Sequence, residues 1–381
     1  MTTIGIYDIS NAGHSEMNLE VYCRVAHAAN YNVVVFTTTQ TADSVKQQLG
    51  AISEEIRWEI KGSAEHLSKY LNRIEPLCDS EVDLFFFASL YPSIKEFVSY
   101  LRFSPECEIL QQVYNVNRWL KQRLSVDCGP KNNLRHILRQ LFFRRTDHVI
   151  VEYPPIQEYI ERECECPKSV HSFIPVIYNS DGGSVECQKP VFTIPGLVEP
   201  TRRDYMGVID AFEEVMSQAG GDATLHLLGR PTGPSGEEIV SRCENIHSQG
   251  YSLISHRDWI PEYEFKQRIA ESTFLLAPLQ PSINKGCIEE IYGLTKGSGA
   301  ILNSLRTGKP LILPDHFAVD KCIESSTLVY SGKSDLRDII KSAINNPELN
   351  KNAIQNATEN SEKFSLTQQK QRFNSIVEEI V

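Results

Sequence analysis

Five consecutive residues with small or cationic side chains could bind a phosphate group: Thr295, Lys296, Gly297, Ser298 and Gly299. Apolar residues follow them at helical spacing, so a helix is predicted over residues 295–306. The unpaired backbone N–H groups and the dipole at a helix start favour an anion, and glycines let a phosphate approach the backbone. The alternative is an ordinary helix start, at which the glycines only ease packing and Lys296 is solvated.

A pair of arginines after another predicted strand offers further phosphate ligands. The strand VFTIPG ends at Gly196, and the turn GLVEPTRRDY carries Arg202 and Arg203 next to a helix start. A planar guanidinium group suits paired phosphate oxygens, although surface arginines are more often only solvated. Because Arg203 and Lys296 both follow the carboxyl ends of strands in one predicted domain, a diphosphate between them would account for both.

The first predicted strand, IGIYDIS, is followed by Gly13 and His14. A histidine at the carboxyl end of a strand could orient a hydroxyl group or receive its proton near neutral pH. Helix capping or packing would explain it equally well. The loop lacks the G-x-G-x-x-G fingerprint of a dinucleotide-binding turn.

The elements that position these residues alternate between buried strands and amphipathic helices, which predicts doubly wound parallel sheets of the α/β class. The polar segment YNSDGGSVECQK, residues 178–189, interrupts this pattern and is the best candidate linker. We expect a Rossmann-like domain over residues 1–180, a second over residues 189–365, and a last helix over residues 366–381 that could pack back on the first domain. Ligands are expected in a cleft between the domains.

Within the second domain, residues 273–314 are predicted to form a βαβ unit. The apolar runs TFLLAPL and PLILP are interpreted as strands, residues 280–293 as a polar loop, and Gly308 as the end of the helix. Ligands of parallel sheets lie beyond the carboxyl ends of the strands, where Glu289 and Glu290 also fall.

The composition limits the class of protein. A chain of 381 residues with 41% hydrophobic and 23% charged residues is typical of a soluble protein of two domains, and its net charge of −11 argues against nucleic-acid binding. No window has the apolar length of a membrane span. The ten cysteines lack the spacing of a disulfide framework or a zinc site, so thiols in a reducing cytosol are expected. No signal peptide is expected, because strand-like residues begin at Ile4.

Cationic residues concentrate between residues 117 and 145, with one acidic residue among them, Asp127. They are Arg118, Lys121, Arg123, Lys131, Arg135, Arg139, Arg144 and Arg145. The helix predicted over residues 133–144 has an apolar and a basic face. It could rest on an anionic membrane surface, or it could be a core helix with a basic outer face.

Six motifs occur in one order over residues 191–314: IPGLVEPTRRDYMGVIDAF, LHLLGR, WIPEYEF, LLAPL, EEIYG and GKPLILP. In this order they resemble GT-B glycosyltransferases, most nearly the group 1, family 4-like class. The resemblance implies two Rossmann-like domains that face a cleft, with a nucleotide-sugar donor on the C-terminal domain and the acceptor on the N-terminal domain. It also implies glycosyl transfer without a metal or other cofactor, since basic side chains and a helix N-terminus stabilise the leaving diphosphate.

The resemblance assigns roles to matching positions. Arg203 matches the lysine that contacts the diphosphate, and Glu290 matches the first glutamate of the E-x7-E motif, which contacts the sugar. The other expected contacts are Tyr292 and Gly293 in the Phe-Gly pair of that motif, Gly229 and Arg230 after the second strand, Trp259 and Ile260 beside the base, and Gly13 and His14 on the acceptor side.

Two positions depart from the family pattern. Ser298 stands where the second glutamate, the usual ribose partner, is expected, and Leu197 follows Gly196 where an arginine is usual. Arg202 or Lys296 could supply the missing charge.

These features predict a cytoplasmic hexosyltransferase of polysaccharide biosynthesis, with peripheral membrane attachment as an option. It would move a sugar from a nucleotide-sugar to a glycan or lipid-linked saccharide, with retention favoured by the resemblance and with His14 and Glu290 as catalytic residues. A UDP-sugar epimerase of GT-B fold stays open as an alternative. So does an inactive GT-B binding module, because the second motif glutamate is missing.

Overall fold

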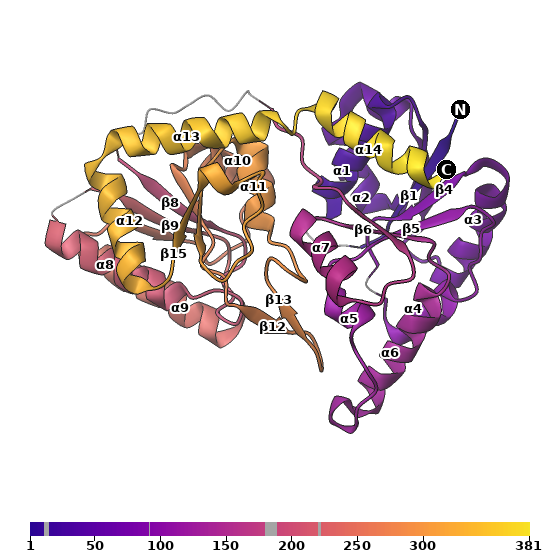
Figure 1. Cartoon of the computed structure of the whole chain (residues 1–381), viewed down its shortest axis with the longest axis horizontal. Coiled ribbons are helices and arrows are strands. Elements are labelled where there is room, and N and C mark those ends of the chain that lie inside the picture. The colour runs from indigo at the N-terminus through magenta and orange to yellow at the C-terminus, as the bar shows by residue number, and fades with distance from the viewer. Residues whose placement is uncertain (11–14, 91, 180–188, 220–221) are drawn as a thin grey trace.

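The computed structural model describes residues 1–10, 15–90, 92–179, 189–219 and 222–381, which form two α/β domains side by side (Figure 1). Each domain is a parallel sheet with helices packed on it. The predicted pair of doubly wound domains is therefore confirmed.

Seven parallel strands form the N-terminal sheet, in the order β3-β2-β1-β4-β5-β6-β7. All four residues of the central strand β4 are buried, as expected for a strand covered on both faces. The strands are β1 (Thr3–Asp8), β2 (Asn32–Thr38), β3 (Arg57–Lys61), β4 (Leu84–Phe87), β5 (Glu108–Gln112), β6 (His148–Val151) and β7 (Ser169–Ser172). The helices are α1 (Ser15–Ala28), α2 (Thr39–Leu49), η1 (Gly50–Glu54), α3 (Leu67–Glu81), α4 (Ile94–Tyr100), α5 (Val116–Leu120), η2 (Val126–Cys128), α6 (Gly129–Phe143) and α7 (Pro154–Glu163).

Six parallel strands form the C-terminal sheet, in the order β10-β9-β8-β11-β14-β15. They are β8 (Val191–Pro195), β9 (Thr224–Leu228), β10 (Leu253–Ser255), β11 (Phe274–Leu276), β14 (Leu311–Pro314) and β15 (Thr327–Tyr330). The helices are α8 (Tyr205–Ala219), α9 (Gly233–Ser248), α10 (Glu262–Glu271), α11 (Gly299–Thr307), η3 (Glu324–Ser326), α12 (Lys333–Asn345) and α13 (Pro347–Glu362). The strand order reverses at β8, and the carboxyl ends of β8, β9 and β11 meet at one edge, where ligands of such sheets bind.

The segment expected to be a polar loop contains a β-hairpin. β12 (Ser282–Asn284) and β13 (Glu289–Ile291) pair in antiparallel fashion, and the hairpin lies beside α5 of the N-terminal domain (Figure 1). Two strands of three residues show too few alternations for the sequence to reveal them. The prediction of a loop between β11 and α11 is therefore wrong in this part.

Helix α11 begins later than predicted. Its first residue is Gly299, because Ser298 has extended backbone and caps the helix by accepting a hydrogen bond from Ala300 N–H at 3.4 Å. Thr295, Lys296 and Gly297 thus belong to the preceding turn. The predicted end is confirmed, since Gly308 adopts the left-handed conformation with φ of +65°.

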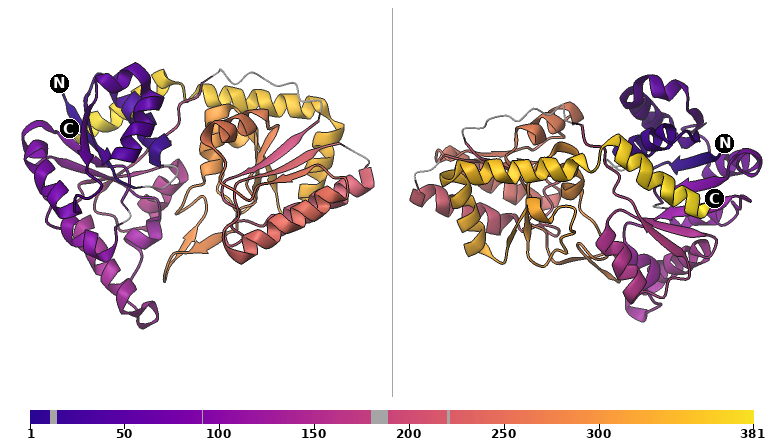
Figure 2. Two further views of the ribbon diagram at one scale, coloured as in Figure 1. Left: turned by 180° about the vertical axis from the view of Figure 1, so that it is seen from behind. Right: turned by 45° about the horizontal axis from the view of Figure 1, so that its top comes forward.

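The chain crosses between the domains twice. It passes from β7 to β8, and again from α13 to α14 (Leu366–Ile380), which packs beside α1 of the N-terminal domain (Figure 2). Phe373 of α14 is fully buried, with its ring centroid 5.5 Å from that of Phe173 and 6.2 Å from that of Tyr22. At the crossing, Tyr178 N–H donates to the carbonyl oxygen of Phe364 at 3.0 Å, which fastens the two connections to each other.

The expectation that all cysteines are thiols needs one correction. Cys128 at the start of α6 and Cys287 in the β12–β13 loop form a disulfide, with Cα atoms 5.2 Å apart. The two residues are 159 positions apart and belong to different domains, so their spacing in the sequence gave no sign of the pair. This bond ties the hairpin to the N-terminal domain.

Candidate functional site

The turn between β13 and α11 places Lys296 where the two domains meet. Thr295 Oγ1 accepts a hydrogen bond from Ile291 N–H at 2.7 Å, and the carbonyl oxygen of Lys296 accepts one from Gly293 N–H at 2.8 Å. Gly293 is required in this turn, because its φ is +84° and a Cβ there would lie 2.7 Å from the backbone nitrogen of Ala318. The turn therefore fixes the backbone of Lys296 just before the helix starts.

Lys296 is half-buried among other charged side chains. Burial lowers the pKa of its ammonium group to about 8; Glu152 and Glu290 oppose this change, whereas Arg202 and Lys285 reinforce it. A cation that is partly dehydrated and lies near two further cations gains strongly from an added anion. The surroundings of Lys296 thus suit a phosphate group.

Glu152, which directly follows β6 of the N-terminal domain, lies against the start of α11. Gly297 N–H donates a hydrogen bond to its carboxylate, and a Cβ on Gly297 would be only 2.2 Å from Glu152 Oε1. Burial raises the pKa of Glu152, whereas Lys296 and the Gly297 N–H lower it. The carboxylate therefore occupies a position in which a phosphate oxygen could accept the same hydrogen bond. Glu152 was not predicted as a site residue, although a carboxylate at the carboxyl end of a buried strand was a usable signal.

Glu290 joins the domains through its side chain. Its carboxylate is fully buried and accepts hydrogen bonds from the backbone N–H groups of Arg118 at 2.8 Å and Asn117 at 3.2 Å, in the first turn of α5. Burial raises the pKa of this carboxyl group, and hydrogen bonds from Thr295 and the two backbone groups lower it. Val116 N–H donates to the carbonyl oxygen of Thr295 at 3.0 Å and strengthens the same contact. In this conformation Glu290 caps α5.

The two predicted arginines have different surroundings. Arg202 Nε donates to the hydroxyl group of the buried Tyr292 at 3.0 Å, and Arg202 lies near enough to Lys296 to affect its pKa. Arg203 is buried, and its Nη1 donates to the carbonyl oxygen of Leu197 at 2.9 Å. Its Nε is buried without a hydrogen-bond partner among the described residues. The structure thus brings Arg202 to Lys296, while Arg203 secures the turn after β8.

Gly196 and Gly229 end the neighbouring strands β8 and β9 and let the two turns touch. A Cβ on Gly229 would lie 2.2 Å from the carbonyl oxygen of Gly196, and Gly196 itself has a φ of +94°. Beside them, the guanidinium group of Arg230 lies 5.7 Å from the ring of Trp259, whose side chain is 66% exposed. Ile260, the next residue, is buried. An exposed aromatic ring beside an arginine is a surface on which a planar base could stack.

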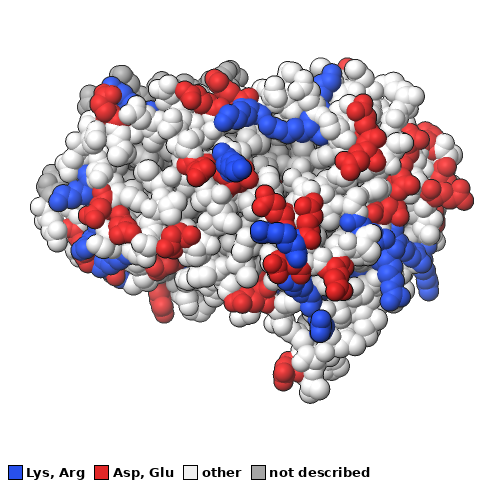
Figure 3. Space-filling view, in the orientation of Figure 1, with Lys and Arg blue, Asp and Glu red and all other residues white. Residues whose placement is uncertain are grey.

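The predicted residues on the acceptor side are not among those described. Gly13 and His14 fall within residues 11–14, outside the described part of the chain. In the ranges that are described, no group of three or more His, Cys, Asp or Glu side chains could hold a metal ion. Figure 3 shows basic and acidic side chains intermingled on the face where the domains meet.

No family model and no curated protein sequence matches this chain. Solved structures match it over 90% or more of both chains. HepE of Anabaena in complex with UDP-glucose gives a TM-score of 0.67 at 13% identity, covering 100% of both chains. A glycosyltransferase from Rickettsia africae gives a TM-score of 0.63 at 12% identity, covering 100% of this chain and 98% of the other. A putative UDP-N-acetylglucosamine 2-epimerase from Listeria monocytogenes gives 0.51 at 11% identity, over 93% and 90% of the chains.

These similarities establish the architecture. The full chain aligns with these structures, one of which is described as a glycosyltransferase, at TM-scores of 0.63 and 0.67. The chain therefore has the GT-B fold, as the resemblance implied.

Proposed function

We propose that this protein is a glycosyltransferase that moves a hexosyl group from a nucleotide-sugar to a glycan or lipid-linked saccharide. The observation that carries the proposal is the half-buried Lys296 at the entrance to α11, within electrostatic reach of Arg202 and Lys285 and next to the Gly297 N–H. These are the groups that a nucleoside diphosphate needs. HepE, a structure with the same fold, was solved with UDP-glucose, which favours a nucleotide-sugar as the ligand of this class of site.

The proposed donor site uses cationic side chains in place of a metal. Lys296 and Arg202 would bind the diphosphate, and the Gly297 N–H would donate to one of its oxygens. As the bond to the sugar breaks, negative charge grows on the diphosphate, and these fixed donors would stabilise it. Arg203 would support the site by holding the turn from Leu197 to Tyr205 through its hydrogen bonds.

Donor binding would change the contacts between the domains. The Glu152 carboxylate would have to leave the Gly297 N–H, because a phosphate oxygen and a carboxylate cannot share that position. Glu290 would similarly have to leave the α5 backbone before it could contact sugar hydroxyls, the role that the family pattern gives it. We therefore infer that the described conformation precedes donor binding, with both carboxylates held on the opposite domain.

The remaining predicted residues complete the proposed site. The Arg230 and Trp259 pair would stack on the base, Ser298 would offer its hydroxyl group to the ribose, and His14 would serve the acceptor. Retention of configuration rests on the family resemblance alone.

An epimerase is the second candidate, because an epimerase structure shares the fold. The two functions differ in what they need. A transferase releases nucleoside diphosphate only when a sugar has left the donor, whereas an epimerase converts a nucleotide-sugar without any acceptor. The test is to incubate UDP-glucose and UDP-N-acetylglucosamine with the protein, with and without cell-envelope glycans, and to separate the products. Free UDP that rises with added glycan supports the transferase; an isomerised nucleotide-sugar supports the epimerase.

We also propose that α6 attaches the protein to an anionic membrane surface on the cytoplasmic side. Leu134, Ile137 and Leu141 lie on one face of α6 and are 44%, 42% and 41% exposed, and the neighbouring Val126 is 96% exposed. Within the described residues, no helix is long and apolar enough to cross a bilayer. An exposed apolar strip with basic neighbours suits the membrane interface. Flotation with anionic vesicles at low salt should recover the protein, and Ile137→Asp should not float.

A further inference from the structure

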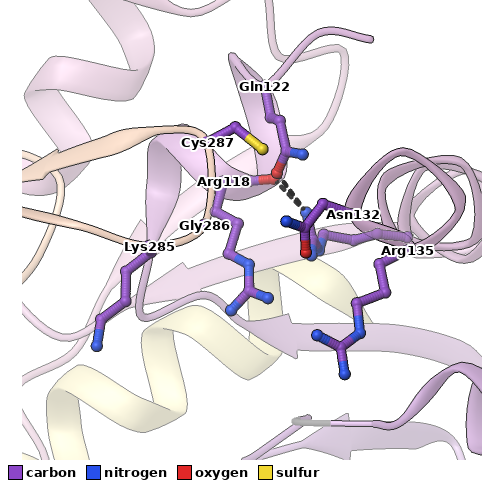
Figure 4. A pocket seen from close by; sticks show the side chains of 8 residues that line it. Arg118, Gln122, Asn132, Arg135, Lys285, Gly286 and Cys287 are labelled. Atoms are coloured by element: carbon purple, nitrogen blue, oxygen red, sulfur yellow. Dashed lines mark hydrogen bonds between the residues drawn. The ribbon is translucent and has the colours of Figure 1, made fainter. Parts of the chain in front are cut away.

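A second cationic site lies beside the proposed donor site, in a pocket between α5, α6 and the β12–β13 loop (Figure 4). Four of its lining residues are cationic: Arg118, Arg135, Arg139 and Lys285. The amide side chains of Gln122 and Asn132 also line it, and none of its lining residues in the described structure is acidic. All charged side chains that line the pocket are therefore positive.

Arg139 is the most buried of the four cations that line this pocket. It is 4% exposed, and its Nη1 donates to the carbonyl oxygen of Arg118 at 2.7 Å and to Gln122 Oε1 at 3.0 Å. Its guanidinium group also lies 5.5 Å from the ring of Trp119. A buried arginine held by neutral oxygens and an aromatic ring keeps its positive charge without a carboxylate in direct contact.

The other cations reach into the same space from three separate segments. Figure 4 shows the side chains of Arg118, Arg135 and Lys285 extending in one direction. Arg135 Nε is buried and has no hydrogen-bond partner among the described residues. A buried guanidinium nitrogen without a partner costs free energy until a ligand supplies an acceptor.

The like charges repel one another. Burial, with smaller contributions from Arg118 and Arg135, lowers the pKa of Arg139 to about 10, and Glu290 opposes this change. Burial also lowers the pKa of Lys285, with Arg202 and Arg118 acting in the same direction. Lys285 is thus close to Arg202 of the donor site and to Arg118 of the pocket. The pocket continues the cationic surface of the donor site toward the N-terminal domain.

We propose that this pocket binds a phosphate group carried by the acceptor, and this inference rests on the proposed transferase function. Three guanidinium groups and one ammonium group match the oxygens of a phosphate better than those of a carboxylate, which has fewer acceptor positions. The N-terminal domain contributes three of the four cations, as an acceptor site on that domain requires. The acceptor is thus a phosphorylated sugar or a lipid-linked sugar phosphate.

The test is a titration of inorganic phosphate, followed by calorimetry, into protein saturated with UDP, so that the donor site is already filled. Wild type should bind phosphate, and Arg135→Gln and Lys285→Gln should each weaken that binding about tenfold, the loss of one charge-assisted contact. Lys131→Gln is the matched control, because Lys131 lies on the same helix α6, is exposed and does not line the pocket. Thermal unfolding of each variant verifies that it is folded.

The outcomes separate this proposal from the donor site. Loss of phosphate binding in Arg135→Gln with unchanged UDP affinity supports the pocket. A wild type that does not bind UDP would refute the donor site, and the same comparison of wild type with Arg135→Gln, made without UDP, then tests the pocket separately. Competition by a hexose phosphate identifies a soluble acceptor, and competition by vesicles containing phosphatidic acid identifies a lipid. Phosphate binding that is equal in wild type and Arg135→Gln, or absent from wild type, overturns the proposal.

Discussion

Glu290 of the C-terminal domain accepts a hydrogen bond from the backbone N–H of Arg118 in the N-terminal domain at 2.8 Å. The residue expected to contact the donor sugar is therefore a helix cap between the domains in this conformation. The same carboxylate can serve both purposes only in sequence, so the proposed function requires the Glu290 side chain to leave α5 when the donor binds. The proposed function therefore predicts that donor binding changes the contact between β13 and α5.

Removal of this cap should destabilise the protein. Glu290→Ala leaves the buried N–H groups of Asn117 and Arg118 without acceptors, which costs about 1–3 kcal/mol. Urea denaturation should show this loss, and Glu289→Ala, at the exposed neighbouring position, should leave the free energy of unfolding nearly unchanged. Equal stability of Glu290→Ala and wild type would mean that the cap does not exist in solution.

Glu152 should compete with the donor. Its carboxylate accepts the Gly297 N–H hydrogen bond that a phosphate oxygen would need. Glu152→Ala should therefore tighten UDP binding about tenfold, the value of one charge-assisted contact. Glu158→Ala on α7 is the control for a general change of charge in the same domain. Weaker UDP binding in Glu152→Ala would instead make Glu152 a ligand of the donor.

Donor affinity should decline at alkaline pH. Lys296 has a pKa lowered to about 8 by burial, so its ammonium group loses its proton as the pH rises through 8. A bound diphosphate favours the charged form, so UDP binding should weaken about tenfold between pH 7 and pH 9. The variant Lys296→Met should bind weakly and show little of this dependence. A wild-type affinity that is constant over this range would contradict the assignment.

Stability should fall in acid because of a histidine pair in the C-terminal domain. His226 Nε2 lies 2.7 Å from His256 Nε2, and burial, His256 and Arg268 lower the pKa of His226 to about 3. The unfolded chain has a normal histidine pKa near 6.5, so below that pH only the unfolded state binds this proton. Stability is therefore lost as the pH falls from 6.5 toward 3, by up to about 1.4 kcal/mol per pH unit.

The variant His226→Gln should flatten that acid dependence. Urea denaturation at several pH values measures it, and His247→Gln at an exposed position of α9 is the control. If wild type and His226→Gln lose stability in parallel, the histidine pair does not control acid sensitivity.

The fold was largely predictable, because local patterns determine it. The alternation of apolar runs and amphipathic stretches predicted both sheets, and Gly308 predicted the end of α11. The site was less predictable, because its contacts join distant parts of the chain. Glu152 accepts a hydrogen bond from Gly297 N–H across the boundary between the domains, although the two residues lie far apart in the sequence. The periodicity of apolar residues gives no information about contacts between distant residues.

The basic region shows the same limit. The sequence predicts a basic face on the helix over residues 133–144, yet two arginines of that helix, Arg135 and Arg139, line the pocket against the hairpin together with Arg118. The β12–β13 loop supplies the other side of that pocket through Lys285, Gly286 and Cys287. The sequence did not predict this hairpin loop, because the flanking strands β12 and β13 are short and largely polar.

The central claim is that Lys296 and Arg202 bind the diphosphate of a nucleotide-sugar, and calorimetric titration with UDP tests it most directly. Wild type should bind UDP, and Lys296→Met and Arg202→Gln should each weaken binding by about 1.5–3 kcal/mol, as expected for charge-assisted contacts. Lys266→Met, at an exposed position of α10, should bind like wild type. The claim is contradicted if wild type does not bind UDP, or if Lys296→Met binds it with unchanged affinity.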